Sequence, residues 1–205
     1  MRFFKKKVRS RTDASDGHII ITGTGRTGTT LLIQFFTVLG FNTGYDVSEA
    51  LSSVDPISYA GLERPLIAEN SPYVIKSPWY ADELMNALEC KQTRIHAALI
   101  PMRDIFSAAE SRRRVSEAGA TAGGLWYTDN PETQENALAF QFYKAVYPLI
   151  KFRVRTYFFC FPDFAEDFGY FWSAIEPLLR EHGIRRSEAR KAFLKVVNPA
   201  KIHRF

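Results

Sequence analysis

The sequence contains little cysteine and little histidine, and their placement excludes several classes of protein. Its 205 residues include two cysteines, Cys90 and Cys160, and four histidines, and neither kind is clustered. A disulfide scaffold or a structural zinc site requires grouped cysteines, so both are excluded, and we predict two free, buried thiols. The histidines lack the spacing of metal ligands, so we also predict no metal site.

Long apolar runs are missing as well. The apolar segment nearest the N-terminus, residues 18–22, is far shorter than the ~20 residues that cross a bilayer. It follows residues 1–11, which hold six basic side chains and no acidic one. We therefore predict a basic flexible arm over residues 1–17, no integral membrane segment and a cytoplasmic protein.

The rest of the chain has the composition of one globular domain. Hydrophobic residues make up 46% and charged residues 24%, so a disordered or fibrous protein is excluded. The length of 205 residues fits a single domain, which we assign to residues 18–205. A formal net charge of +5 suits an anionic ligand without requiring a nucleic acid, and we expect no nucleic-acid partner.

Strand and helix patterns alternate along this domain. Short β-branched or aromatic runs predict strands, and apolar residues at helical spacing predict helices. The predicted strands are residues 19–21, 73–76, 94–102 and 156–161, and the predicted helices are residues 29–39, 80–89, 104–117, 131–152, 164–179 and 187–197. Such alternation is typical of an α/β protein with a parallel sheet. Two long segments without periodicity, residues 41–71 and 119–130, are predicted to be functional loops.

A glycine-rich turn, residues 23–30, lies between the first strand and its helix and reads GTGRTGTT. At such a turn, unpaired backbone N–H groups and the helix dipole favour a bound phosphate, and glycine allows close backbone approach. Threonine hydroxyls at the same place can donate to phosphate oxygens. The predicted anion-binding residues are Gly25, Arg26, Thr27, Gly28, Thr29 and Thr30.

Two familiar phosphate-binding patterns fit this turn poorly. The dinucleotide fingerprint G-x-G-x-x-G is present, and Asp46 has about the right distance for its acidic ribose ligand, but residues 41–45 make a poor second strand. A P-loop nucleotide kinase or NTPase needs a lysine where this chain has Thr29. Both stay open as alternatives to a third pattern, in which the positive charge lies inside the loop at Arg26.

Other polar residues are predicted to lie near the turn because they follow strands. Lys76 ends the second predicted strand, Arg103 ends the third, and Ser111 lies on the next helix. The carboxyl ends of parallel strands face the ligand crevice, and a guanidinium can bind phosphate through two N–H groups. The basic run at residues 112–114 makes this helix strongly basic near the proposed phosphate, and most of the run is interpreted as a solvated helix face.

Together these residues resemble the sulfotransferase family. Residues 26–30, RTGTT, match the family pattern (K/R)-(S/T)-G-(S/T)-(S/T), which grips the 5′-phosphosulfate of 3′-phosphoadenosine 5′-phosphosulfate (PAPS). The arginine form looks more like carbohydrate and protein-tyrosine members. Arg103 with Ser111 is similar to the family's 3′-phosphate motif, and Lys76 to a lysine after its next central strand. Pro78 stands where cytosolic members have a catalytic histidine, and their carboxyl-terminal R-K-G loop is missing.

The resemblance implies a P-loop-type three-layer α/β sandwich with a central parallel sheet of four or five strands flanked by helices. It implies PAPS as co-substrate, 3′,5′-ADP as product, no metal, and an acceptor hydroxyl, that of a carbohydrate among the candidates. Arg26 and Lys76 are the expected charge-stabilising residues, and Arg103 and Ser111 the expected 3′-phosphate ligands. For the general base, the resemblance to protein-tyrosine members favours Asp46. A nucleotide-binding protein of the same fold without turnover is the alternative from another functional class.

Four aromatic residues are further candidates for ligand contacts. Phe161 and Trp79 are candidates for stacking on adenine. Trp126 and Tyr127 lie in the segment 119–130, where they could stack on a sugar or line an apolar pocket.

Overall fold

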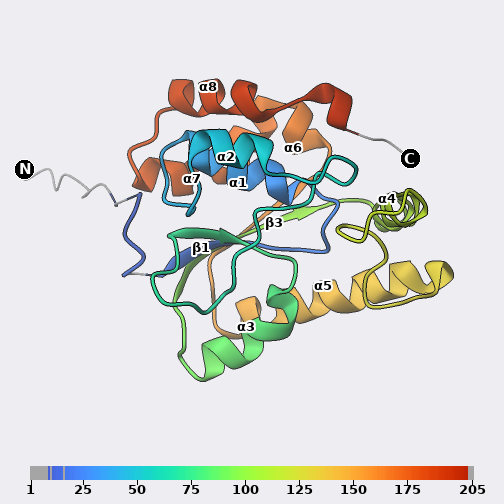
Figure 1. Ribbon diagram of the computed structural model, residues 1–205. Helices are drawn as coiled ribbons and strands as arrows, with labels where there is room; N and C mark the ends of the chain where they lie inside the picture. The colour runs from blue at the N-terminus through green and yellow to red at the C-terminus, as the bar shows by residue number, and fades with distance from the viewer. Residues whose placement is uncertain (1–8, 10, 16, 203–205) are drawn as a thin grey trace, which may run out of the picture.

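The computed structural model describes residues 9, 11–15 and 17–202, and a four-stranded sheet lies at its centre (Figure 1). The strands are β1 (His18–Ile21), β2 (Val74–Lys76), β3 (Ile95–Met102) and β4 (Thr156–Cys160). All neighbouring pairs are parallel, and the strand order is β2-β1-β3-β4. The predicted α/β class with a parallel sheet is confirmed.

Helices cover both faces of this sheet. In Figure 1, α1, α2, α7 and α8 lie above the sheet, α3 and α5 lie below it, and α4 lies at one end. The helices are α1 (Thr29–Val38), α2 (Val47–Ser52), α3 (Tyr80–Glu89), α4 (Ile105–Glu117), α5 (Gln134–Lys151), α6 (Asp163–Glu166), α7 (Phe168–Glu181) and α8 (Arg186–Val196), with short 3₁₀ turns η1 (Pro131–Thr133) and η2 (Pro199–Lys201).

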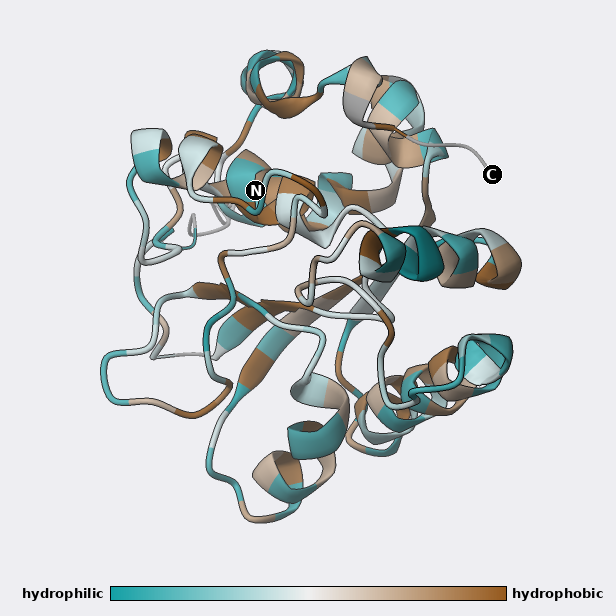
Figure 2. Ribbon diagram, turned by 45° about the vertical axis from the view of Figure 1, so that its right-hand side comes forward, coloured by the Kyte–Doolittle hydropathy of each residue, from teal (hydrophilic) through white to brown (hydrophobic). Residues whose placement is uncertain are grey.

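Alternate residues of β1 contribute to two separate hydrophobic cores. Ile19 and Ile21 belong to the core that α1, α7 and α8 complete, whereas Ile20 packs with Tyr80 and Leu84 of α3. Successive side chains of a strand point to opposite faces, so three consecutive isoleucines are all buried only where helices cover both faces. Figure 2 shows the sheet enclosed by helices that carry both hydrophobic and hydrophilic residues.

The strand order brings three strand ends to one edge of the sheet. From β1 the chain crosses to β2 on one side and then to β3 on the other, so the direction of winding reverses at β1. Ile21 at the end of β1 pairs with Lys76 of β2 and with Leu99 of β3. In open parallel sheets, ligands bind outside the carboxyl ends of the strands at such a reversal point.

Three sequence-based expectations of the fold differ from the structure. The predicted helix 164–179 is two helices, α6 and α7, because Asp167 between them is extended and caps α7. Both cysteines are exposed, not buried as predicted, because Cys90 lies at the end of α3 and Cys160 ends the edge strand β4. The segment 41–71, predicted as one loop, contains the six-residue helix α2. Among the described residues, no helix combines the length and the apolar character needed to cross a membrane.

The expected arm, residues 1–17, lies partly outside the described residues. Its described part contacts the amino-terminal edge of the sheet. The backbone N–H of Arg9 donates to the carbonyl oxygen of Glu181 at 2.7 Å, and its Nε donates to the Tyr73 hydroxyl at 3.1 Å. Arg11 donates to the carbonyl oxygen of Leu39 at 3.1 Å.

Candidate active site

A cavity of about 990 Å³ opens at the carboxyl ends of β1, β2 and β3. The glycine-rich turn lines it, and so do Lys76, Arg103 and Ser111. Other walls come from residues 58–61, 121–126 and 195–199. The structure therefore gathers residues that are widely separated in the chain around one volume, and that volume is large enough for a nucleotide-sized ligand.

The glycine-rich turn keeps its backbone donors unpaired. Gly23, Gly25 and Gly28 have φ angles of 139°, 69° and 82°, and Arg26 between them has φ 58°. In the described part of the chain, the backbone N–H groups of residues 25–31 donate no hydrogen bond, and the first turn of α1 holds no acidic residue. The turn thus offers several free donors at the positive end of a ten-residue helix, an arrangement that favours an anion.

The Arg26 side chain connects the turn to two neighbouring segments. Its Nε donates to Ser111 Oγ on α4 at 3.0 Å, and its Nη1 donates to the carbonyl oxygen of Ser58. Asp55 holds Ser58 in place, because its Oδ1 accepts from the Ser58 backbone N–H at 2.6 Å. Burial, reinforced by the nearby charge of Arg103, lowers the pKa of Arg26. Since Ser111 Oγ accepts from Arg26, its own proton stays available for a ligand oxygen.

Arg103 follows β3 directly and lies beside Arg26. Its Nη1 is 3.5 Å from the Arg26 carbonyl oxygen, and its guanidinium carbon is 5.4 Å from the centroid of the Phe161 ring. Burial lowers the pKa of Arg103, while the charge of Asp104 opposes that effect. Arg26, Arg103 and Ser111, which the sequence predicts to lie near one another, thus form one polar cluster at the cavity.

Lys76 is buried at the end of β2 and uses all three of its N–H groups. Its Nζ donates to Thr30 Oγ1 at 3.2 Å, to the Gly61 carbonyl oxygen, and to Glu63 Oε1 at 2.6 Å. Burial lowers the pKa of Lys76, and the ion pair with Glu63 opposes that effect. Because Thr30 Oγ1 accepts from Lys76, its hydroxyl proton can be donated to a ligand on the turn.

Arg112 differs from the sequence-based expectation of a solvated helix face. Its side chain is 4% exposed, whereas Arg113 is half-buried and pairs with Glu135 of α5, and Arg114 is exposed and pairs with Glu110. Arg112 Nη2 donates to the Thr24 carbonyl oxygen at 2.5 Å, and Nη1 donates to the Gly124 carbonyl oxygen at 2.6 Å. The reason is its position on α4: Ser111 and Arg112 are on the side that faces the cavity, as their places in its lining show.

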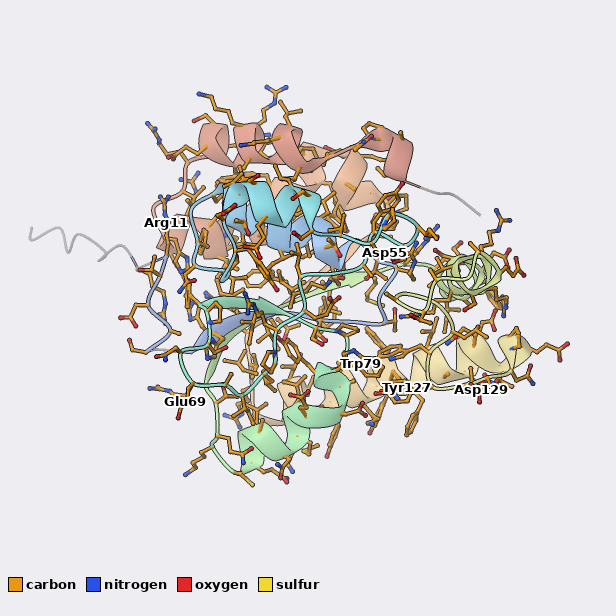
Figure 3. The ribbon with its side chains drawn as sticks, viewed as in Figure 1. Arg11, Asp55, Glu69, Trp79, Tyr127 and Asp129 are labelled. Carbon is orange, nitrogen blue, oxygen red and sulfur yellow. The ribbon has the colours of Figure 1, made fainter. Side chains whose placement is uncertain are left out.

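An aromatic cluster of Trp79, Trp126 and Tyr127 lies at the cavity. The Trp79 ring centroid is 5.6 Å from those of Trp126 and Tyr127, and the latter two are 4.8 Å apart. Figure 3 shows Trp79 and Tyr127 side by side where α3 and α5 meet. Trp79 and Trp126 line the cavity, and Trp79 is half-exposed. Residues 119–130, here named the Trp126 loop, thus contribute an apolar wall.

Asp46 does not line this cavity. Its carboxylate caps α2, where Oδ1 accepts from the Glu49 backbone N–H at 2.8 Å. Thr27, a predicted anion ligand, is fully buried and does not line the cavity either. Its Oγ1 has no hydrogen-bond partner among the described residues. Glu69, another carboxylate of the segment 41–71, lies well away from Trp79, toward another edge of the molecule (Figure 3). The described residues contain no group of three or more His, Cys, Asp or Glu placed to hold a metal ion.

Two functional candidates were missed in the sequence. Glu63 lies in the segment predicted to be a loop, and no pattern distinguishes it there, yet it lines the cavity and pairs with Lys76. Arg112 stands within the basic run 112–114, and the sequence does not distinguish it from the two arginines that follow it. The segment 195–199 at the end of α8 also borders the cavity and takes part in the site without any recognisable motif.

The comparison with solved structures finds a similar chain described as "Sulfotransferase Domain from the Curacin Biosynthetic Pathway". The two chains share 16% sequence identity, the match covers 86% of this chain and 77% of that one, and the TM-score is 0.47. No protein-family model and no curated protein matches the chain. A functional conclusion therefore depends on the residues that line the cavity.

Proposed function

We propose that this protein transfers a sulfuryl group from PAPS to a hydroxyl group of an acceptor. The convergence of the unpaired glycine-rich turn with Arg26, Lys76, Arg103 and Ser111 on one cavity supports this proposal most strongly. PAPS is anionic at both the 5′ and the 3′ positions of its ribose, and these residues offer cations and donors for both. Thr29, in place of the lysine of nucleotide-hydrolysing P-loops, disfavours ATP or GTP as the ligand.

Each residue has a distinct role in this proposal. The N–H groups of the turn, with Thr29 and Thr30, bind the 5′-phosphosulfate, and Arg103 and Ser111 bind the 3′-phosphate. PAPS supplies an activated sulfuryl group on its 5′-phosphate. Arg26 stabilises the negative charge that develops on the departing phosphate and the sulfuryl oxygens, and Lys76, whose N–H groups are occupied, contributes through its charge and by orienting the Thr30 hydroxyl. Fixed cations in a partly buried site are effective because they need no reorganisation during the reaction.

We assign the proton acceptor to Glu63, in preference to Asp46. Glu63 lines the cavity, its side chain is 37% exposed, and Lys76 holds its Oε1. The other carboxylate oxygen accepts no hydrogen bond from the described residues, so it can take a proton. In the proposed step, the acceptor oxygen bonds to sulfur, its proton moves to Glu63, and the sulfur–oxygen bond to the phosphate breaks. The electron pair of that bond stays on the 5′-phosphate of 3′,5′-ADP.

The acceptor is proposed to bind against the aromatic wall. Trp79 comes three residues after Lys76, and Trp126 and Leu125 continue the same wall, so a ring or apolar group placed there lies near the reacting centre. The cavity surface on this side is mostly uncharged, which suits a neutral hydroxyl compound such as a sugar or an aromatic alcohol.

A nucleotide panel tests the proposal. Ligand binding raises the melting temperature in proportion to the logarithm of concentration over Kd, so 3′,5′-ADP should stabilise the protein more than ADP or 5′-AMP at equal concentration. Replacing Arg103 by Ala should remove this preference by weakening 3′,5′-ADP about tenfold or more, because charge-assisted hydrogen bonds are lost. Equal stabilisation by ADP and 3′,5′-ADP would contradict the assignment of the 3′-phosphate site.

An acceptor screen completes the test. The protein is incubated with PAPS and a mixture of sugars and aromatic alcohols, and sulfated products are sought by mass spectrometry. We expect product only in the presence of both substrates. A protein that binds 3′,5′-ADP tightly and transfers sulfate to no acceptor would instead fit the nucleotide-binding alternative.

A further inference from the structure

Arg112 makes contacts that the reaction proposed above does not use. Its guanidinium donates through Nη2 to the carbonyl oxygen of Thr24, in the glycine-rich turn, at 2.5 Å. Through Nη1 it donates to the carbonyl oxygen of Gly124, in the Trp126 loop, at 2.6 Å. One buried side chain therefore joins two loops that line the cavity on its nucleotide side and its acceptor side.

Two carbonyl dipoles and an aromatic ring compensate the charge of Arg112. In the described part of the chain no carboxylate pairs with it, and its Nε is buried without a hydrogen-bond partner. Besides the two carbonyl groups, the Trp126 ring lies below the guanidinium, with 4.9 Å between the guanidinium carbon and the ring centroid. Burial and the nearby Arg26 lower the pKa of Arg112 to about 9, so it keeps its charge at neutral pH. A buried cation of this kind is stabilised further when an anion binds nearby.

The packing around Arg112 leaves little freedom on either side. A Cβ at Gly25 would lie only 2.6 Å from Arg112 Nη2, so the guanidinium fits because that residue is glycine. On the other side, the Leu125 backbone N–H donates to Ser116 Oγ at 2.8 Å. The Trp126 backbone N–H donates to Gln134 Oε1 at 2.7 Å. Because Arg112 is tightly packed, a shift of the glycine-rich turn would also displace Gly124 and strain the hydrogen bonds that hold Leu125 and Trp126.

We propose that Arg112 couples the glycine-rich turn to the Trp126 loop, so that a nucleotide on the turn fixes Trp126 and completes the acceptor wall. The inference rests on the proposed function, because it takes the ligand of the turn to be 3′,5′-ADP or PAPS. Arg112 is then a positioning residue. It acts on the acceptor through Trp126, and its loss should uncouple the two loops while nucleotide binding persists.

Trp126 itself provides the readout. The chain has three tryptophans, so a variant with Trp79→Phe and Trp172→Phe reports on Trp126 alone. In that background we expect 3′,5′-ADP to shift the emission of Trp126. Adding Arg112→Lys keeps the charge but removes the two guanidinium nitrogens that bind Thr24 and Gly124 at the same time. This variant should lose most of the emission shift, while calorimetry should show a Kd for 3′,5′-ADP within about threefold of the value without the Arg112 change. Arg114→Lys is the matched control, because it is the same change on the exposed side of α4 and should leave the shift intact.

Hydrogen exchange gives a second measurement, on the chain with all its residues unchanged. The N–H groups of Leu125 and Trp126 are bonded to Ser116 and Gln134, so their exchange reports on the order of the loop. We expect 3′,5′-ADP to slow the exchange of both. An unchanged exchange rate at these two positions with 3′,5′-ADP bound would overturn the coupling, even if Arg112→Lys did not fold.

Two further outcomes are decisive. If Arg112→Lys weakens 3′,5′-ADP as much as Arg103→Ala does and leaves the emission shift intact, Arg112 is a phosphate ligand and the proposal is wrong. If the unchanged chain binds no 3′,5′-ADP, the proposed function fails. The coupling between the two loops can then be tested without ligand. Arg112→Lys should speed hydrogen exchange at the Leu125 and Trp126 N–H groups, and Arg114→Lys should not. Equal exchange rates in the two variants would overturn the coupling as well.

Discussion

Among single residues, the two carboxylates Glu63 and Asp46 offer a direct test of the acid–base chemistry. Glu63 lines the cavity beside Lys76, whereas Asp46 caps α2. Replacing Glu63 by Gln keeps the shape of the side chain and removes the proton acceptor. We expect kcat to fall by about 10²–10⁴, the usual range for loss of a general base, with 3′,5′-ADP affinity nearly unchanged. Initial rates of sulfate transfer and titration calorimetry measure the two quantities.

Asp46→Asn is the matched control, since it makes the same carboxylate-to-amide change. Asn is as good an N-cap as Asp, so α2 should persist and kcat should stay close to that of the unchanged enzyme. A large loss of rate in Asp46→Asn together with normal turnover in Glu63→Gln would return the base to Asp46, the residue that the family resemblance favours.

The sequence revealed the residues that stand next to a recognisable structural boundary. Arg26, Lys76 and Arg103 could be predicted because each is in the turn after a strand or at a strand end, and such ends meet at one edge of a parallel sheet. Glu63 and Arg112 could not, because their roles depend on which side chains the tertiary fold brings beside them. A loop glutamate and an arginine within a basic run look like ordinary surface residues until Lys76 and Gly124 are placed next to them.

Among elements, the start of α1 depends on the absence of a side chain at Gly28. Its φ is 82°, and a Cβ there would lie 2.8 Å from Phe164 Cζ and 3.0 Å from Phe161 Cδ2. Phe164 is fully buried, so it has little room to move. We expect Gly28→Ala to lower the free energy of unfolding by about 2–4 kcal/mol, from left-handed strain and overpacking together, and to weaken 3′,5′-ADP binding. Urea unfolding and calorimetry check both effects.

Gly40, just beyond the other end of the same helix, separates strain from overpacking. Its φ is 78°, nearly that of Gly28, but a Cβ there would meet no atom within 4 Å. Gly40→Ala should therefore show only the conformational term, about 1–2 kcal/mol, and leave 3′,5′-ADP affinity unchanged. If both variants lost the same stability, the contact with Phe164 and Phe161 would contribute nothing.

The order of elements was predictable because the spacing of apolar residues and the positions of turn-forming residues agree along much of the chain. The isoleucine run of β1, the helical spacing of α1 and the turn between them follow from local sequence alone. The helix α2 was missed because it has only six residues, too few to show a period. The exposed cysteines were misjudged for a related reason: composition predicts burial on average, whereas Cys90 and Cys160 stand at the end of a helix and of an edge strand.

Across the whole molecule, two polar clusters occupy opposite edges of the sheet. The proposed site lies at the carboxyl ends of the strands, and a network around His96 lies at their amino ends. His96 Nε2 is 2.8 Å from Arg155 Nη2, which can only donate, and 3.2 Å from Glu181 Oε2; toward Arg155 it accepts, in its neutral form. Arg155 also binds both carboxylate oxygens of Glu181, at 2.5 and 2.8 Å. Protonation of His96 would therefore disrupt its contact with Arg155, which joins β3 to the segment leading into β4, whereas Glu181 would still face the ring.

This arrangement predicts that acid destabilises the fold through His96 before it affects the carboxylates. Burial, with the charges of Arg9 and Arg155, lowers the pKa of His96 to about 4 from its ordinary 6.5, against the opposing charge of Glu181. Between these values the unfolded chain holds the proton and the folded chain does not, so the free energy of unfolding falls as the pH drops from 6.5 toward 4. The His96 share is on the order of 2–3 kcal/mol across that range. His96→Gln keeps an acceptor for Arg155 and cannot titrate, so urea midpoints at pH 7 and pH 5 should differ less in this variant than in the unchanged chain. The same loss of stability in both proteins would show that other groups, such as the buried His182, carry the acid sensitivity.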